Sequence, residues 1–121
     1  MRIDVCVSCR AAGDPAEPRE GRPGARLAAA LESVATDGIE IARVDCLSVC
    51  KRPCTIAFSA RGKWTYVYGD FGPDAAADVL VCARTYADAT EGIIPWKERP
   101  EALKRGVVAR IPPFTRKEAA Q

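Results

Sequence analysis

Five of the six cysteines stand in two short clusters, and their spacing is the feature of this sequence most able to carry chemistry. The stretch VCVSCR contains Cys6 and Cys9, and the stretch DCLSVCKRPC contains Cys46, Cys50 and Cys54 at strict intervals of four residues. Thiolates grouped in this way hold zinc or an iron–sulfur cluster, or work as a redox pair. The two clusters are therefore the candidate site.

The chain has no histidine, and this limits the kinds of metal site and catalysis that its side chains can support. Mixed Cys/His zinc sites, Rieske clusters and acid–base catalysis by histidine are excluded, so a metal site must use four thiolates. Four-thiolate zinc sites favour two C-x-x-C pairs, whereas here only Cys6 and Cys9 have that spacing. The spacing favours an iron–sulfur cluster and leaves zinc as an alternative.

Composition indicates one cytoplasmic domain. The 121 residues carry a formal net charge of +2, which lacks the strong basic excess of a nucleic-acid-binding protein. No apolar run approaches the roughly 20 residues of a membrane span. Asp4 interrupts the first apolar stretch, so we expect no export signal. In the cytoplasm thiols stay reduced, and clustered cysteines are ligands or redox groups more often than disulfides.

Hydrophobic periodicity predicts an α/β domain with the element order β-α-β-β-β-α. The expected elements are a strand at 2–7, a long loop at 10–24, a helix at 25–38, a strand at 39–46, a hairpin at 54–71 and a helix at 72–89. We place this domain at residues 1–92. Residues 93–121 are rich in proline, and we expect an irregular extension that packs on the domain or on a partner.

The first two predicted strands both end in cysteines. If these strands are parallel neighbours, their carboxyl ends meet at one edge of the sheet. Cys6 and Cys9 would then face Cys46 and Cys50 across a short gap. The long loop at 10–24 is unusual for a small domain, and loops of this kind often lie over a functional site.

Three basic residues, Arg10, Lys51 and Arg52, flank the cysteines. They would lower thiolate pKa values, favour a reduced cluster or attract an acidic partner, or they belong to a solvated loop.

The remaining candidates read mainly as packing residues. Cys82 lies in an apolar stretch of the second helix and is expected to be a core thiol. Trp64, Tyr66 and Tyr68 alternate along a strand and are expected in the core. Trp96 stands in the extension, where it either anchors a protein interface or packs on the domain.

Several motifs carry a family resemblance over most of the chain: CVSCR, CLSVCKRPC, TIAF, KWTYVYGD and IPWKERP. With them the chain resembles the thioredoxin-like [2Fe-2S] ferredoxins and, more closely, the DUF1636 family of predicted metal-binding proteins. The resemblance implies a thioredoxin-like fold, with Cys46 and Cys50 as one ligand pair and Cys6 as the first ligand of the other. In the ferredoxin group the other upstream ligand lies several to a dozen residues beyond the first cysteine, whereas here only Cys9 is available. Cys54 replaces Cys9 as ligand, is a spare thiol, or packs at the start of the hairpin.

The resemblance further implies an electron carrier rather than an enzyme, with a protein redox partner, and it suggests a homodimer. The family is associated with cobalamin synthesis and cobalt handling, which implies a corrin-ring enzyme as partner or metal trafficking. A zinc- or cobalt-binding module remains the alternative. A thiol–disulfide oxidoreductase built on Cys6 and Cys9 is less favoured, because the long loop separates Cys9 from the predicted helix.

Overall fold

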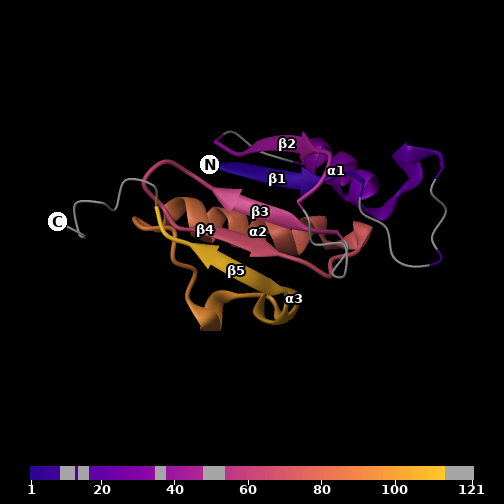
Figure 1. The fold of residues 1–121 in the computed structure, drawn as a ribbon. Coiled ribbons are helices and arrows are strands. Elements are labelled where there is room, and N and C mark those ends of the chain that lie inside the picture. Colours follow the sequence, from indigo (N-terminus) through magenta and orange to yellow (C-terminus); the bar gives the residue numbers. More distant parts are fainter. Residues whose placement is uncertain (9–12, 14–16, 35–37, 48–53, 114–121) are drawn as a thin grey trace.

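The structure is a computed structural model of the chain, and it describes residues 1–8, 13, 17–34, 38–47 and 54–113 (Figure 1). Its elements, in chain order, are β1 (Arg2–Cys6), η1 (Arg19–Gly21), α1 (Pro23–Val34), β2 (Glu40–Val44), β3 (Ile56–Ser59), β4 (Thr65–Tyr68), η2 (Pro73–Ala75), α2 (Ala76–Asp88), η3 (Trp96–Glu98), α3 (Glu101–Arg105) and β5 (Val107–Ile111).

The five strands form one sheet in the order β2-β1-β3-β4-β5. Strands β1 and β2 are parallel, with Cys6 opposite Val44, and each of the other neighbouring pairs is antiparallel. The predicted order β-α-β-β-β-α and the predicted parallel pairing of the first two strands are both confirmed.

Helices α1 and α2 cover one face of the sheet, because each presents an apolar stripe to it (Figure 1). Leu27 and Leu31 of α1 are fully buried. The helix begins at Pro23, slightly earlier than predicted, since proline is well suited to a first helical position. Within the described part of the chain, no helix is long and apolar enough to cross a bilayer.

Aromatic side chains fill the space between the sheet and α2. Tyr66 and Tyr68 are fully buried and stack with their ring centroids 5.7 Å apart. Phe58 lies at the edge of the Tyr68 ring, and Tyr86 of α2 at the edge of the Tyr66 ring. The core assignment is therefore confirmed for Tyr66 and Tyr68, whereas Trp64 precedes β4 and is half-buried.

The extension at residues 93–113 is more regular than its proline content suggested. It contains α3 and the strand β5, which pairs with β4, so the prediction of an irregular extension is wrong there. The reason is the position of the prolines: Pro100 immediately precedes α3 and Pro112 follows β5, so neither interrupts an element.

The extension also contributes to the core. Ile94 and Leu103 are fully buried, whereas Trp96 is 59% exposed. Arg99 holds the segment in place, because its Nε and Nη2 atoms donate to the Ile94 carbonyl at 3.0 and 2.8 Å. Its guanidinium lies 5.5 Å from the centroids of the Tyr66 and Trp96 rings. Residues 93–113 therefore pack as part of the domain.

Candidate cofactor site

Three cysteines lie at one edge of the sheet, which we name the cysteine rim: Cys6, Cys46 and Cys54. Cys6 is the last residue of β1, Cys46 follows the end of β2, and Cys54 precedes β3. Because β2 is parallel and β3 antiparallel to the central β1, these three chain positions meet at the same edge. Cys9 and Cys50 lie outside the described residues.

Cys6 is fixed between its two neighbouring strands. Its side chain is buried, with the residue only 2% exposed, and its backbone N–H donates to the Thr55 carbonyl at 3.0 Å. The sulfur lies 3.6 Å from the Asp45 carbonyl oxygen and 3.6 Å from the Ser8 hydroxyl. The Ser8 hydroxyl itself donates to the same Asp45 carbonyl. The Cys6 sulfur is thus held where β1 and β2 end.

Cys54 has an unusual backbone conformation for a non-glycine residue. Its φ is +61°, in the left-handed region, and the residue is 2% exposed. Left-handed φ values cost a non-glycine residue roughly 1 kcal/mol or more, and such outliers gather at functional sites. The neighbouring Thr55 supplies the carbonyl that receives the Cys6 N–H, so the backbone beside Cys54 is hydrogen-bonded to the end of β1. This geometry supports Cys54 as a ligand candidate.

Cys46 differs from the two buried thiols because it is exposed to solvent. It directly follows Asp45, whose carbonyl receives the Cys6 and Ser8 contacts. The Asp45 carboxylate pairs with Arg19 at 3.1 Å, and both side chains are more than half exposed. Such a surface pair contributes little stability, so its consequence is mainly positional. The rim therefore combines protected sulfur with sulfur that a partner can reach.

The described part of the long loop reaches the rim, as expected for a loop over a functional site. Arg19 lies in η1, and Arg22 donates from Nη1 to the Ser8 carbonyl at 3.2 Å. Sequence reasoning did not find these two residues or Asp45 as parts of the site. Their partners are far away in the chain, and no local pattern marks them; the length of the loop was the available signal. Arg10, Lys51 and Arg52 lie outside the described residues.

Cys82 is a packing residue, as predicted. It is fully buried in α2 among the core side chains, and burial raises the pKa of its thiol to about 11. Among the described residues, no three Cys, Asp or Glu side chains form a group that could hold a metal ion. A four-thiolate site at the rim therefore also needs sulfur from the segments that contain Cys9 and Cys50.

Comparison with known families identifies the family of this chain. The family model described as "Protein of unknown function (DUF1636)" matches residues 3–113. The chain belongs to the DUF1636 family. This DUF1636 chain shares its fold with the thioredoxin-like [2Fe-2S] ferredoxin from Aquifex aeolicus, with a TM-score of 0.56. The alignment covers 94% of this chain and 96% of that chain at 19% sequence identity. The thioredoxin-like fold is thereby confirmed. No curated protein matches the DUF1636 chain.

Proposed function

We propose that this DUF1636 protein is a carrier of single electrons that binds a [2Fe-2S] cluster at the cysteine rim. The observation that carries the proposal is the position of Cys6, Cys46 and Cys54 at the same edge of a thioredoxin-like sheet. The structurally similar protein is described as a [2Fe-2S] ferredoxin, and the rim offers the same donor chemistry, thiolate sulfur.

Four cysteine thiolates are the usual ligands of a [2Fe-2S] cluster, and the two cysteine clusters of this chain supply five thiols. Cys6, Cys9, Cys46 and Cys50 would hold it, with Cys54 as the alternative to Cys9. When bound, the cluster supplies reversible one-electron chemistry. The protein supplies the thiolates, keeps water from Cys6 and Cys54 by burial, and leaves Cys46 accessible.

The electrostatic surroundings fit the same role. Arg22 donates to the Ser8 carbonyl, and Arg19 donates to the Asp45 carboxylate. Ser8 and Asp45 contact the Cys6 sulfur through the Ser8 hydroxyl and the Asp45 carbonyl, so both arginines lie near the rim. Positive charge near a cluster stabilises its reduced state, which carries one more negative charge.

The proposal includes the partner and the assembly that the family resemblance implies. We propose a protein redox partner, with an enzyme of cobalamin synthesis as the first to test, a cytoplasmic location and a homodimer. Transfer of electrons to a purified corrin-ring enzyme tests the partner, and the mass of the protein in solution tests the homodimer. A monomeric mass would remove the homodimer and leave the cluster proposal intact.

A zinc- or cobalt-binding module is the second candidate, and the exposure of Cys46 favours it. A solvent-exposed ligand beside buried ones allows a metal ion to enter and leave without unfolding of the site. A thiol–disulfide oxidoreductase is supported less, because a redox pair formed by Cys6 and Cys9 would leave the cluster of Cys46, Cys50 and Cys54 without a role.

One experiment separates these candidates. The protein is purified without oxygen, its visible spectrum is recorded, and iron, sulfide and zinc are assayed on the same sample. We expect a brown protein with about two irons and two sulfides per chain, and we expect its colour to bleach on reduction. Colourless protein with one zinc per chain and no sulfide would replace the cluster with the metal-binding module.

Single cysteine-to-serine variants then assign the ligands. Substitution of Cys6, Cys46 or Cys50 should lower the cluster content severely, and comparison of the Cys9 and Cys54 variants identifies the fourth ligand. The matched control is Cys82→Ser, because Cys82 lies in the core of α2. A cluster content that falls equally in the control and in the rim variants would indicate general destabilisation rather than loss of a ligand.

A further inference from the structure

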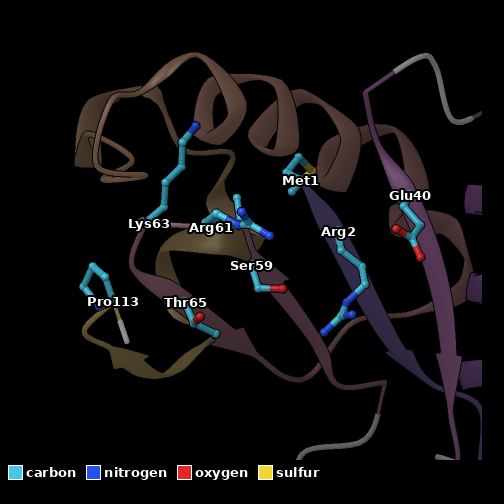
Figure 2. Close-up of a pocket in the computed structure, with 10 residues that line it drawn as sticks. Met1, Arg2, Glu40, Ser59, Arg61, Lys63, Thr65 and Pro113 are labelled. Carbon is cyan, nitrogen blue, oxygen red and sulfur yellow. The ribbon is translucent and has the colours of Figure 1, made fainter. Parts of the chain in front are cut away.

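A second concave site lies at the opposite end of the sheet from the cysteine rim (Figure 2). Its volume is ≈ 850 Å³, within the range of roughly 300–1,000 Å³ that is typical of small-molecule pockets. The pocket begins at Arg2, the first residue of β1, whereas Cys6 ends the same strand. At the rise of a β-strand, roughly 13 Å of backbone separates the two sites. The residues that line the pocket are Met1, Arg2, Glu40, Ser59, Ala60, Arg61, Gly62, Lys63, Thr65 and Pro113.

The charges that line the pocket are mainly positive. Arg2, Arg61 and Lys63 each contribute a cationic side chain, and the Met1 ammonium group adds another. Glu40 is the acid among the described lining residues. A concave surface with this balance concentrates anions, because its low-dielectric walls focus the field.

Two of the cations are already engaged by carbonyl groups. The Lys63 ammonium donates to the carbonyls of Tyr86 and Ala87, in the last turn of α2, at 3.1 and 2.7 Å. In Figure 2 its side chain extends toward that helix. The Met1 ammonium donates to the Gly38 carbonyl at 3.0 Å. These groups contribute positive potential but are not free to become the main ligands of an anion.

Arg61 is the cation that is available. Among the described residues it has no hydrogen-bond acceptor and no acidic partner, and it lies on the hairpin turn between β3 and β4. The turn is well defined, because the Lys63 N–H donates to the Ala60 carbonyl at 3.1 Å and Gly62 adopts a φ of +75°. Figure 2 shows the Arg61 side chain reaching toward Ser59 and Met1. A guanidinium with five N–H donors thus lines the pocket without an acceptor from the part of the chain that the structure describes.

Neutral donors accompany it on the sheet. The register places Ser59 opposite Arg2, and Thr65 begins the adjacent strand β4. The two hydroxyls of Ser59 and Thr65 therefore line the pocket beside the arginines. Arg2 also contacts Asp4, with its Nε 3.1 Å from the carboxylate. Guanidinium and hydroxyl donors together can bind several oxygens of one phosphate group.

We propose that this pocket binds the phosphate group of a small phosphorylated molecule. Arg61 is the principal ligand, and Ser59 and Thr65 donate their hydroxyls. Arg2, Lys63 and Met1 supply the positive potential. Glu40, at the wall, faces the rest of the molecule and selects a hydroxyl or amino group there. The site is independent of the cysteine rim, so it stands whether or not a cluster is bound.

Calorimetric titration with inorganic pyrophosphate tests the proposal on the full chain, at low ionic strength and again at about 0.15 M salt. The expected result is saturable binding of one pyrophosphate per chain. Arg61→Gln should weaken it about tenfold or more, because the charge-assisted guanidinium contacts are lost. Ser59→Ala should weaken it less. The matched control is Arg26→Gln, which removes the same charge from an exposed position on α1 and should change the affinity less than about twofold.

Three results would overturn the proposal. One is the absence of saturable binding in the unsubstituted protein. Another is an equal loss in the Arg26→Gln and Arg61→Gln variants, which would assign the binding to net charge. The third is tighter binding of malonate than of pyrophosphate, which would assign the pocket to carboxylates. Changes in backbone amide NMR signals should map to residues 59–65, and unperturbed signals from the core of Arg61→Gln exclude unfolding as the cause of its effect.

Discussion

Removal of one hydroxyl group from the aromatic core should stabilise the protein. The Tyr68 side chain is fully buried, and its hydroxyl has no hydrogen-bond partner among the described residues. Burial raises the pKa of this phenol far above its usual value. In the unfolded chain the same hydroxyl is hydrated, so folding removes a hydrogen bond to water without replacing it. The substitution that tests this is Tyr68→Phe.

The change in the free energy of unfolding follows from two features of Tyr68: the packing contacts that its ring keeps in the Phe variant, and the hydrogen bond that its hydroxyl lacks. A buried polar group without a partner costs about 1–3 kcal/mol. The phenyl ring retains the stacking on Tyr66 at 5.7 Å and the edge contact with Phe58 at 5.4 Å. A small loss of packing around the deleted oxygen offsets part of the gain. We expect the free energy of unfolding to rise by about 1 kcal/mol and the melting temperature by about 3–4 °C.

Tyr86→Phe is the matched control, because it deletes a hydroxyl that does have a partner. Tyr86 is also fully buried, but its hydroxyl donates to the Trp64 carbonyl at 2.6 Å. Loss of that bond should lower the free energy of unfolding by about 1–2 kcal/mol. The two tyrosine-to-phenylalanine changes are chemically identical, so their opposite signs isolate the effect of the hydrogen bond.

Urea unfolding, followed by far-UV circular dichroism under reducing conditions, measures both variants against the parent protein in one metal state. Equal slopes with urea concentration show that the shift of the midpoint reports stability. A Tyr68→Phe variant that is less stable than the parent by about 1 kcal/mol would refute the reasoning. That result would mean that the hydroxyl is satisfied in solution.

Four further substitutions test the packing and the pH dependence. Gly92→Ala should cost about 2–3 kcal/mol, because Gly92 has a φ of +77° and an added Cβ would lie 2.7 Å from Tyr86 Cε1. Gly38→Ala, at a φ of +87° with nothing within 4 Å, should cost only about 1 kcal/mol; equal losses in urea unfolding would contradict the steric argument. Leu103→Ala should cost about 2–4 kcal/mol in the same assay, because Leu103 is fully buried, and a loss below about 0.5 kcal/mol would place the extension outside the core. The folded pKa of Cys82 is raised from 9.0 to about 11, so the unfolded thiol ionises first and stability falls as pH rises through this window. Cys82→Ala should flatten the decline in melting temperature between pH 9 and 11, and an unchanged decline would show that another group causes it.

The order of elements and the edge at which the thiols meet could be predicted because both follow from local patterns. Alternating apolar residues such as Ile3 and Val5 mark β1, and both are fully buried. The helical spacing of Leu27 and Leu31 marks α1, and both lie in the core. Once β1 and β2 are adjacent and parallel, the placement of Cys6 near the end of β2 follows from geometry.

The remainder depends on contacts between distant residues, which a single sequence does not encode in any local pattern. Asp45 contacts the Cys6 sulfur through its backbone carbonyl, a group that every residue possesses. Arg61 is distinguished by its lack of a partner among residues 1–8, 13, 17–34, 38–47 and 54–113, which only the packed structure reveals. In the extension, β5 could not be predicted because of the neighbouring prolines. A sequence does not show whether a proline lies at the boundary of a strand or inside it until the boundaries of the strand are known.

The position of β5 has a consequence for how the protein is made. A ribosome releases the thiols of the rim early, since Cys54 precedes the middle of the chain, whereas β5 and the buried Ile94 and Leu103 emerge late. Until then β4 has an unpaired edge and the aromatic core lacks part of its cover. We expect the cysteines of the nascent chain to be exposed to oxidants, metal ions and assembly factors before the domain closes. Under the proposed function, a cofactor inserted after folding would meet two buried thiols, Cys6 and Cys54.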